Sequence, residues 1–265
     1  MSQRYDVLVI EDEKIVVDSI RKILIPEGFT VDDTVNVEIA LQNLEKNIYK
    51  LIITDLMLPK ISGLKLIEVA NIKYPNIPII MITGYATLEN ALLSLKYGAF
   101  DFIPKPFSFA ECLGVVHRAL NFIRIGRTTI EQKKNRRVFH THTIKDHPTK
   151  CYLLGKFIWV KIDRTGSAEV GVDHIFPKTI GDIKNIKLPL ANEQVVQGEA
   201  LAQIHTEDHY IHTIWAPLSG RIIDIRQIIK SNNNLINKDI FFQDWLVSMI
   251  PTNLEEEIPN LKFLE

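Results

Sequence analysis

Short apolar runs alternate with helix-spaced apolar residues through the first 120 positions, and this alternation is the strongest constraint on the fold. The runs suit buried parallel strands; they occupy residues 7–10, 51–53, 79–82 and 102–103, with a weaker one near 29–31. Between them, apolar residues recur at helical spacing, as at Val16, Ile20, Ile23 and Leu24. The pattern predicts an α/β fold, a doubly wound parallel sheet of five strands.

Chemically useful side chains follow the ends of these runs. They are Glu11, Asp12 and Glu13 after the first strand, Asp55 after the third, Thr83 after the fourth and Lys105 after the fifth. In doubly wound folds, the carboxyl ends of the strands share one edge. Any one of these residues alone would be read as a helix cap or a solvated loop residue. Their joint placement instead favours a site.

Crowded carboxylates repel one another, which raises a carboxyl pKa. A hard divalent cation relieves this repulsion, and oxygen ligands suit Mg²⁺. A carboxylate left free beside the metal can attack a phosphoryl group. A hydroxyl and an ammonium group can then bind the phosphoryl oxygens. The sequence therefore predicts a phosphoryl-accepting site that uses Mg²⁺.

Four segments in this order resemble the receiver domain of two-component response regulators. They are VIEDE at residues 9–13, ITDLMLP at 53–59 followed by Ser62-Gly63, MITGYA at 81–86 and GAFDFIPKPF at 98–107. The resemblance implies the flavodoxin-like form of the fold for a domain spanning residues 1–125. It also implies that Asp55 accepts phosphate from a phosphohistidine on a sensor histidine kinase.

The same resemblance assigns roles around Asp55. Mg²⁺ would be held by Glu11, Asp12, Asp55 and the backbone carbonyl of Met57. Lys105 would pair with the phosphoryl oxygens. Thr83 would swing to the new phosphate, and Phe102 would turn inward behind it. The motif wording is closest to receivers of transcriptional activators with an ATPase domain, but the P-loop pattern G-x-x-x-x-G-K-[ST] does not occur in the chain.

The charge distribution separates a connector at residues 126–150 from the segments on either side. Residues 1–120 carry 12 Lys and Arg against 15 Asp and Glu, residues 121–150 carry 8 against 2, and residues 151–265 carry 11 against 15. The connector is polar and lacks sustained periodicity, which is typical of a solvated linker. Its basic run at 133–137 could contact nucleic acid, and His140, His142 and His147 could bind metal; the linker interpretation is preferred for both.

Residues 151–265 change to short strands and turns. Residues 157–162 and 168–172 flank the turn Asp163-Arg164-Thr165-Gly166 and predict a hairpin. Further strands are expected at 200–205, 211–215 and 221–225, and a short helix within 254–264. The pattern predicts a small all-β sandwich or flattened barrel.

This second region resembles the glycine cleavage system H protein, a β-sandwich of the lipoyl-carrier class. The resemblance rests on segments including VGVDH at 170–174, IGDI at 180–183, VVQGE at 195–199, WAPLSG at 215–220, LINKD at 235–239 and WLV at 245–247. That family carries lipoate on a lysine eight residues before the proline of the A-P-x-S-G turn. Here that position is His209, and no lysine occurs between Lys187 and Lys230. We therefore expect no lipoate, and a binding role in place of carrier chemistry.

The segment around His209 reads HTEDHYIH, residues 205–212. Its three histidines and two acids suggest a metal site. Strand alternation, however, places His205 and His212 on opposite faces. An exposed polar tip is the preferred interpretation.

The expected protein is a cytoplasmic phosphorelay response regulator whose non-lipoylated output domain acts through protein contact. Two cysteines, the absence of a signal-peptide layout and the absence of an apolar run of membrane-spanning length underlie the cytoplasmic expectation. The expected partners are a sensor kinase, an output protein that the sequence does not identify and, from the receiver resemblance, a second copy of the chain. We expect no membrane partner, and no nucleic-acid partner because a DNA-reading motif is missing.

Two alternative functions stay open. In the first, the receiver is inactive and the whole chain is an adaptor. In the second, the H-protein-like domain regulates glycine cleavage or lipoate enzymes. In each case we expect no enzyme activity beyond autocatalytic phosphotransfer and dephosphorylation.

Overall fold

A parallel sheet of five strands forms the centre of the first domain, as predicted. The computed structural model describes residues 3–84, 88–132, 150–226 and 245–264. The strand order is β2-β1-β3-β4-β5, and the strands are β1 (Val7–Ile10), β2 (Val31–Thr34), β3 (Leu51–Asp55), β4 (Ile79–Thr83) and β5 (Asp101–Pro104). Every residue of β1, β3 and β4 is buried, because helices cover both faces of the sheet.

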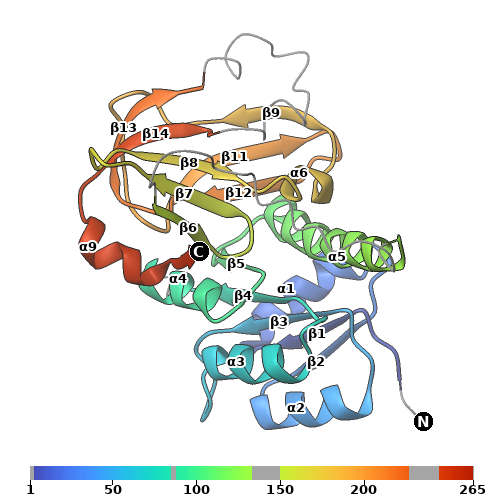
Figure 1. Ribbon diagram of the computed structural model, residues 1–265. Helices are drawn as coiled ribbons and strands as arrows, with labels where there is room; N and C mark the ends of the chain where they lie inside the picture. The colour runs from blue at the N-terminus through green and yellow to red at the C-terminus, as the bar shows by residue number, and fades with distance from the viewer. Residues whose placement is uncertain (1–2, 85–87, 133–149, 227–244, 265) are drawn as a thin grey trace.

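The helices of this domain form two layers (Figure 1). They are α1 (Lys14–Leu24), α2 (Val37–Lys46), α3 (Gly63–Lys73), α4 (Leu88–Lys96) and α5 (Phe109–Gln132). Helix α1 contacts α5 in one layer, and α2, α3 and α4 contact one another in succession in the other. The start of α2 is capped by Asn36, whose side chain accepts a hydrogen bond from the Glu38 amide at 2.7 Å.

Helix α5 continues beyond residue 125, the expected end of the receiver, into the first residues of the expected linker. The basic run at 133–137 and the three connector histidines lie outside the described residues, as do Tyr85 and Ala86 of the third receiver motif and the segment 235–239.

Antiparallel strands in two sheets form the second domain, in agreement with the predicted β-sandwich. One sheet has the order β10-β13-β14-β8-β7-β6-β15 and the other β12-β11-β9. Their bounds are β6 (Lys150–Leu154), β7 (Ile158–Ile162), β8 (Ala168–Val172), β9 (Ile183–Lys187), β10 (Gln194–Val195), β11 (Ala200–Thr206), β12 (Ile211–Trp215), β13 (Gly220–Ile225), β14 (Val247–Pro251) and β15 (Lys262–Leu264). The predicted hairpin is present as β7 paired with β8.

The end of the chain differs in part from the predicted short helix. Helix α9 (Leu254–Glu257) and the 3-10 turn η1 (Ile258–Asn260) lie within the predicted range, but residues 262–264 form β15. Pro259 lacks the amide hydrogen that a continuing helix needs. Strand β15 instead pairs with β6, placing Phe263 opposite Tyr152.

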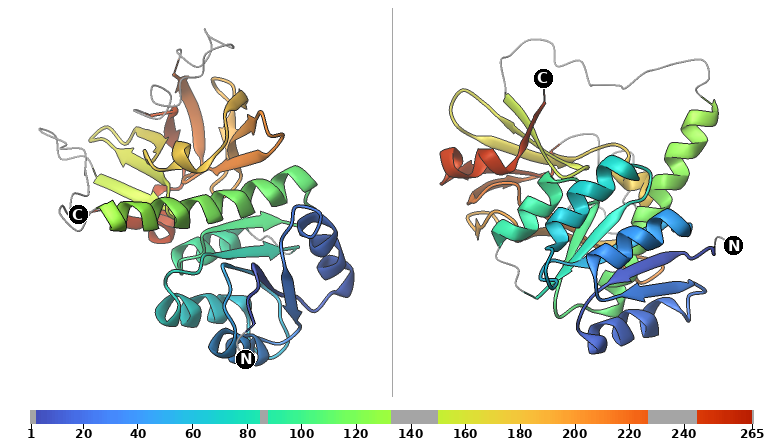
Figure 2. Two further views of the ribbon diagram at one scale, coloured as in Figure 1. Left: turned by 90° about the vertical axis from the view of Figure 1, so that its right-hand side faces the viewer. Right: turned by 90° about the horizontal axis from the view of Figure 1, so that it is seen from below.

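The second domain packs against α4, β5 and α5 of the first. Figure 2 shows α5 lying between the parallel sheet of the first domain and the strands of the second. The helix contacts both β12 and α6 (Phe176–Thr179). Glycine is required at position 114 of α5, because a Cβ atom there would lie 2.3 Å from the Ile211 carbonyl oxygen. Among the described residues, the structure contains no helix with the length and apolar character to cross a membrane.

Candidate phosphoacceptor site

The structure brings three of the predicted acidic residues together at the carboxyl edge of the parallel sheet. Carboxylate oxygens of Glu11, Asp12 and Asp55 all lie within 4.8 Å of one another. Glu11 is 1% exposed and Asp55 is 6% exposed, whereas Asp12 is exposed. The donors are all hard oxygen atoms, and the group combines two buried carboxylates with one accessible to solvent. This donor set suits Mg²⁺.

Lys105 supplies positive charge to this carboxylate group. Its Nζ donates hydrogen bonds of 2.8 Å to Asp55 Oδ2 and 2.8 Å to Glu11 Oε2, and one of 3.4 Å to Glu13. Burial by itself would lower the pKa of Lys105, but the bonds to Asp55 and Glu11 outweigh it and raise the pKa. Burial raises the pKa of Glu11, and the hydrogen bond from Lys105 opposes the rise. The ammonium group therefore holds two buried carboxylates together.

The backbone after β3 fixes the Asp55 side chain. The Leu56 amide donates to Asp55 Oδ1 at 2.5 Å, and the Met57 amide lies 3.4 Å from the same oxygen. Thus Oδ1 faces backbone amides while Oδ2 faces Lys105. Gly63 closes the loop because any Cβ atom there would lie 2.0 Å from the Asp55 carbonyl oxygen. This close approach explains the glycine of the Ser62-Gly63 pair in the sequence motif.

Thr83 and Phe102 lie on the two neighbouring strands beyond Asp55. Thr83 ends β4, is 1% exposed, and its Oγ1 has no hydrogen-bond partner among the described residues. Phe102 on β5 is 2% exposed. Its ring stacks on Trp215 of the second domain, with centroids 4.1 Å apart and planes at 20°. No local sequence pattern indicates this partner, because Trp215 lies 114 positions after Asp101 in the chain.

The segment 205–212 is divided between the interior and the surface. Strands β11 and β12 place His205 opposite Ile211, and Ile204 opposite His212, so the two histidines lie on opposite faces, as expected. His209 is exposed at the tip, with a left-handed φ of 67°. His212 and Thr206, however, are each 1% exposed, so the expectation of an exposed polar tip is wrong for these two residues. In the described part of the chain, these histidines do not form a metal-binding group.

The tip of this hairpin contacts the first domain. Tyr210 stacks on His117 of α5, with ring centroids 4.9 Å apart and planes at 15°. Its hydroxyl lies 3.2 Å from His117 Nε2. His209 is therefore next to a residue that packs against the receiver. Nothing in the sequence pattern of either segment signalled this contact.

Comparisons with known proteins assign the two halves of the chain to two families. The family model described as the response regulator receiver domain matches residues 7–117. The family model described as the glycine cleavage H-protein matches residues 151–262.

Individual relatives each match one half. The nitrogen assimilation regulatory protein NtrX of Azorhizobium caulinodans is 30% identical over 132 residues, 49% of this chain and 29% of that protein. A probable glycine cleavage system H protein of Thermococcus kodakarensis is 29% identical over 103 residues, 39% of this chain and 75% of that protein.

A crystal structure of the receiver domain of NtrX from Brucella abortus is 32% identical to this chain, with a TM-score of 0.42. The match covers 43% of this chain and 98% of the NtrX receiver chain. The chain spans less than a third of the length of the NtrX-type relatives it matches. Residues 7–117 are thus a response regulator receiver domain, and residues 151–262 belong to the glycine cleavage H-protein family.

Proposed function

We propose that the chain is a phosphorelay response regulator in which Asp55 accepts a phosphoryl group from a sensor histidine kinase. The main support is the position of the Asp55 carboxylate, held between backbone amides and Lys105 and beside Glu11 and Asp12. The kinase-derived group would reach Asp55 from the side of the exposed Asp12.

Glu11, Asp12, Asp55 and the backbone carbonyl of Met57 would hold Mg²⁺ at this site. Bound there, the ion would offset the negative charge of the carboxylates and of the phosphoryl oxygens. The two carboxylates Glu11 and Asp55 are already close enough to share Lys105. They would need little rearrangement to act as ligands.

The transfer itself needs one nucleophile and one leaving group. An oxygen of the Asp55 carboxylate attacks phosphorus and forms the new P–O bond. The P–N bond of the kinase phosphohistidine breaks, and its electron pair stays on the imidazole nitrogen. Lys105 then pairs with a phosphoryl oxygen, and the Thr83 hydroxyl donates a hydrogen bond to another. Thr83 Oγ1 is suited to this because it lacks another partner among the described residues.

The H-protein domain would serve as the output and act by protein contact. His209 stands where the family carries its lipoyl lysine, and an imidazole does not form a stable lipoyl amide. We therefore propose that the domain is not lipoylated. The chain would be a stoichiometric phosphate acceptor in the cytoplasm, with no turnover beyond its own phosphotransfer and dephosphorylation. Its output protein, and any second copy in a homodimer, would respond to the phosphorylated form.

The domain limits follow from the same proposal. The receiver would occupy residues 1–125, the basic linker 126–150 and the H-protein domain 151–265. A role as regulator of glycine cleavage or lipoate enzymes has weaker support. Such a role would require the tip around His209 to be free to contact those enzymes. The adjacent Tyr210 is instead stacked on His117 of α5.

Mass spectrometry after incubation with acetyl phosphate and Mg²⁺ tests the proposal. We expect the full chain to gain the mass of one phosphoryl group, and this gain to be lost in acid, with EDTA and in Asp55→Asn. Asp18→Asn, a change on the exposed side of α1, is the matched control and should label like the wild type. Labelling of Asp55→Asn to the wild-type extent would overturn the assignment.

A further inference from the structure

Trp215 is held by two consecutive residues of β5. Its Nε1 donates a hydrogen bond of 2.8 Å to Asp101 Oδ1, and its indole stacks on the Phe102 ring at 4.1 Å. Trp215 is 9% exposed, Asp101 is 4% exposed and Phe102 is 2% exposed. The Trp215 side chain of the H-protein domain therefore contacts the fifth receiver strand at two adjacent residues.

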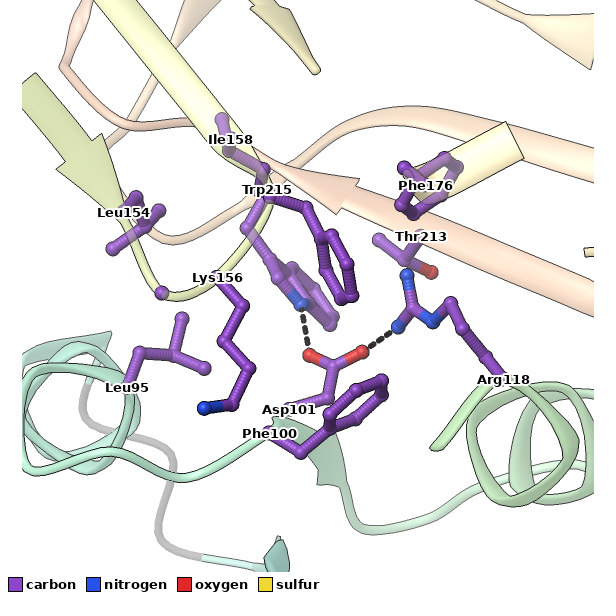
Figure 3. Close-up of a pocket in the computed structure, with 12 residues that line it drawn as sticks. Leu95, Phe100, Asp101, Arg118, Leu154, Lys156, Ile158, Phe176, Thr213 and Trp215 are labelled. Carbon is purple, nitrogen blue, oxygen red and sulfur yellow. Dashed lines mark hydrogen bonds and ion pairs between the residues drawn. The ribbon is translucent and has the colours of Figure 1, made fainter. Parts of the chain in front are cut away.

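The residues around this contact come from both domains and combine aromatic rings with a buried ion pair. Arg118 of α5 forms an ion pair with Asp101, and Figure 3 shows Arg118 and Trp215 reaching the two oxygens of that carboxylate. The guanidinium lies over the rings of Phe100, Phe157 and Phe176, at 5.8, 5.9 and 5.1 Å from their centroids. Asp101, Arg118 and Trp215 also line a small pocket at this junction of the two domains.

A second contact joins the domains independently of Phe102. Tyr210 stacks on His117 at the other end of β12, while Trp215 ends that strand. The two contacts therefore hold opposite ends of one strand. A change at Phe102 would release one end of β12 and leave the Tyr210 contact in place.

Thr83 ends β4, the strand that lies between the strand of Asp55 and the strand of Phe102. In the sheet register, Asp55 is opposite Ile82 of β4, and Met81 of β4 is opposite Phe102 of β5. Thr83 directly follows Ile82, and its hydroxyl is buried with no described partner. A phosphoryl group on Asp55 would offer that hydroxyl an acceptor. Movement of the Thr83 side chain toward it would vacate space beside β5.

We propose that phosphorylation of Asp55 loosens the docking of the H-protein domain by drawing the Phe102 ring away from Trp215. This inference rests on the proposed function, since it needs a phosphoryl group on Asp55. The ring moves into the space beside Thr83, and the indole loses its stacked partner. The coupling is reciprocal: an undocked H-protein domain must favour phosphorylation by the same factor by which phosphorylation favours undocking.

The indole N–H resonance of Trp215 reports this contact directly in the full chain. The chain has three tryptophans, so nitrogen–proton spectra contain three such signals, and Trp215→Phe identifies the relevant one. Beryllofluoride with Mg²⁺ serves as a stable mimic of the phosphoryl group. We expect roughly tenfold faster solvent exchange of the Trp215 N–H on its addition, the size that loss of one aromatic stack gives. Trp159, whose N–H bonds to the Val172 carbonyl at 3.2 Å, should not change.

Three variants separate this proposal from a general loosening. Phe102→Leu should give fast exchange already without beryllofluoride and no further response. Thr83→Ala should keep slow exchange in both states. Tyr210→Ala weakens the contact with His117. The Trp215 N–H should therefore exchange faster without beryllofluoride, and beryllofluoride should still accelerate the exchange. Circular dichroism checks that each variant folds. If Phe102→Leu does not fold, Thr83→Ala still tests the proposal.

The outcomes distinguish the two proposals. If acetyl phosphate labels Asp55 but beryllofluoride leaves Trp215 exchange unchanged, the docking proposal is wrong and the proposed function stands. An undiminished response in Phe102→Leu or Thr83→Ala would also overturn it. If Asp55 takes up no phosphoryl group, the proposed function itself fails.

Discussion

Asp101 of β5 and Arg118 of α5 form an ion pair that is buried where the receiver meets the H-protein domain. Their side chains are 6% and 3% exposed. Burial lowers the pKa of Arg118 to about 9, so the guanidinium remains charged at neutral pH. Because Trp215 bonds to the other Asp101 oxygen, the pair connects strand, helix and second domain in one cluster.

Replacing one member of this pair is expected to be costly. Arg118→Met leaves the Asp101 carboxylate buried without a cation, which typically costs about 3–5 kcal/mol. Urea unfolding followed by circular dichroism measures the loss. Arg21→Met is the matched control, because its ion pair with Asp33 is 37% and 32% exposed and should contribute below about 1 kcal/mol. Adding Asp101→Asn to Arg118→Met should restore part of the loss; equal losses for the two arginines would contradict the prediction.

Two glycines of the same helix are expected to respond oppositely to alanine. At Gly114 a Cβ atom would lie 2.3 Å from the Ile211 carbonyl oxygen, whereas at Gly126 it would meet nothing within 4 Å. Gly114→Ala should therefore force α5 and β12 apart and lower the free energy of unfolding by about 1–3 kcal/mol. Gly126→Ala should raise it by up to about 1 kcal/mol, because alanine favours helix. Thermal and urea unfolding compare the two, and a stabilised Gly114→Ala would show that the domains do not pack as described.

The parallel sheet and its acidic edge could be predicted because each signal is local. An apolar run marks each strand, and the residue that follows it, such as Asp55 or Lys105, occupies the shared edge. The domain interface has no such signal. Trp215 Nε1 bonds to a residue 114 positions earlier, and sequence spacing does not encode a contact of that kind.

Two smaller differences have physical reasons. His212 was expected on an exposed tip, but alternation along β12 turns it into the sandwich, opposite Ile204. The chain end was expected to be helical, but Phe263 and its neighbours complete a sheet edge beside β6. In both cases local propensity is weak, so tertiary packing determines the burial of the residue or the secondary structure of the segment.

Removal of Lys105 is expected to make the stability of the chain depend on Mg²⁺. In Lys105→Met, the buried Glu11 and Asp55 carboxylates face each other without the ammonium group that bonds to both. Unfolding in EDTA should become easier by about 3 kcal/mol. Mg²⁺ should then raise the melting temperature more than in the wild type, because it would neutralise two buried carboxylates that Lys105 already neutralises in the wild type.

Lys65→Met is the control for this prediction. Its ion pair with Glu68 is exposed on α3, at 59% and 45%, so the response to Mg²⁺ should match that of the wild type. Equal melting shifts in Lys105→Met and the wild type would argue against Mg²⁺ binding beside Lys105.

Mild acid is expected to weaken the contact between Tyr210 and His117. Burial lowers the pKa of His117 below the ordinary histidine value of about 6.5, although the nearby acids Glu27 and Asp208 oppose this shift. A histidine with a lowered pKa binds protons more readily in the unfolded or undocked state. Its contribution to stability is therefore full above about pH 6.5 and declines as the pH falls from there toward the lowered value.

Urea unfolding at pH 7 and at pH 5.5 measures this decline. The His117 ring contacts Phe29, with centroids 5.6 Å apart, as well as Tyr210. His117→Phe keeps an aromatic ring in this place but cannot titrate, so the difference in stability between the two pH values should shrink. The pKa of His205 is also lowered by burial and by Lys187, so part of the difference should remain in His117→Phe and diminish further when His205→Phe is added. An unchanged pH dependence in His117→Phe would show that the His117 ring does not carry a proton-linked contact with the H-protein domain.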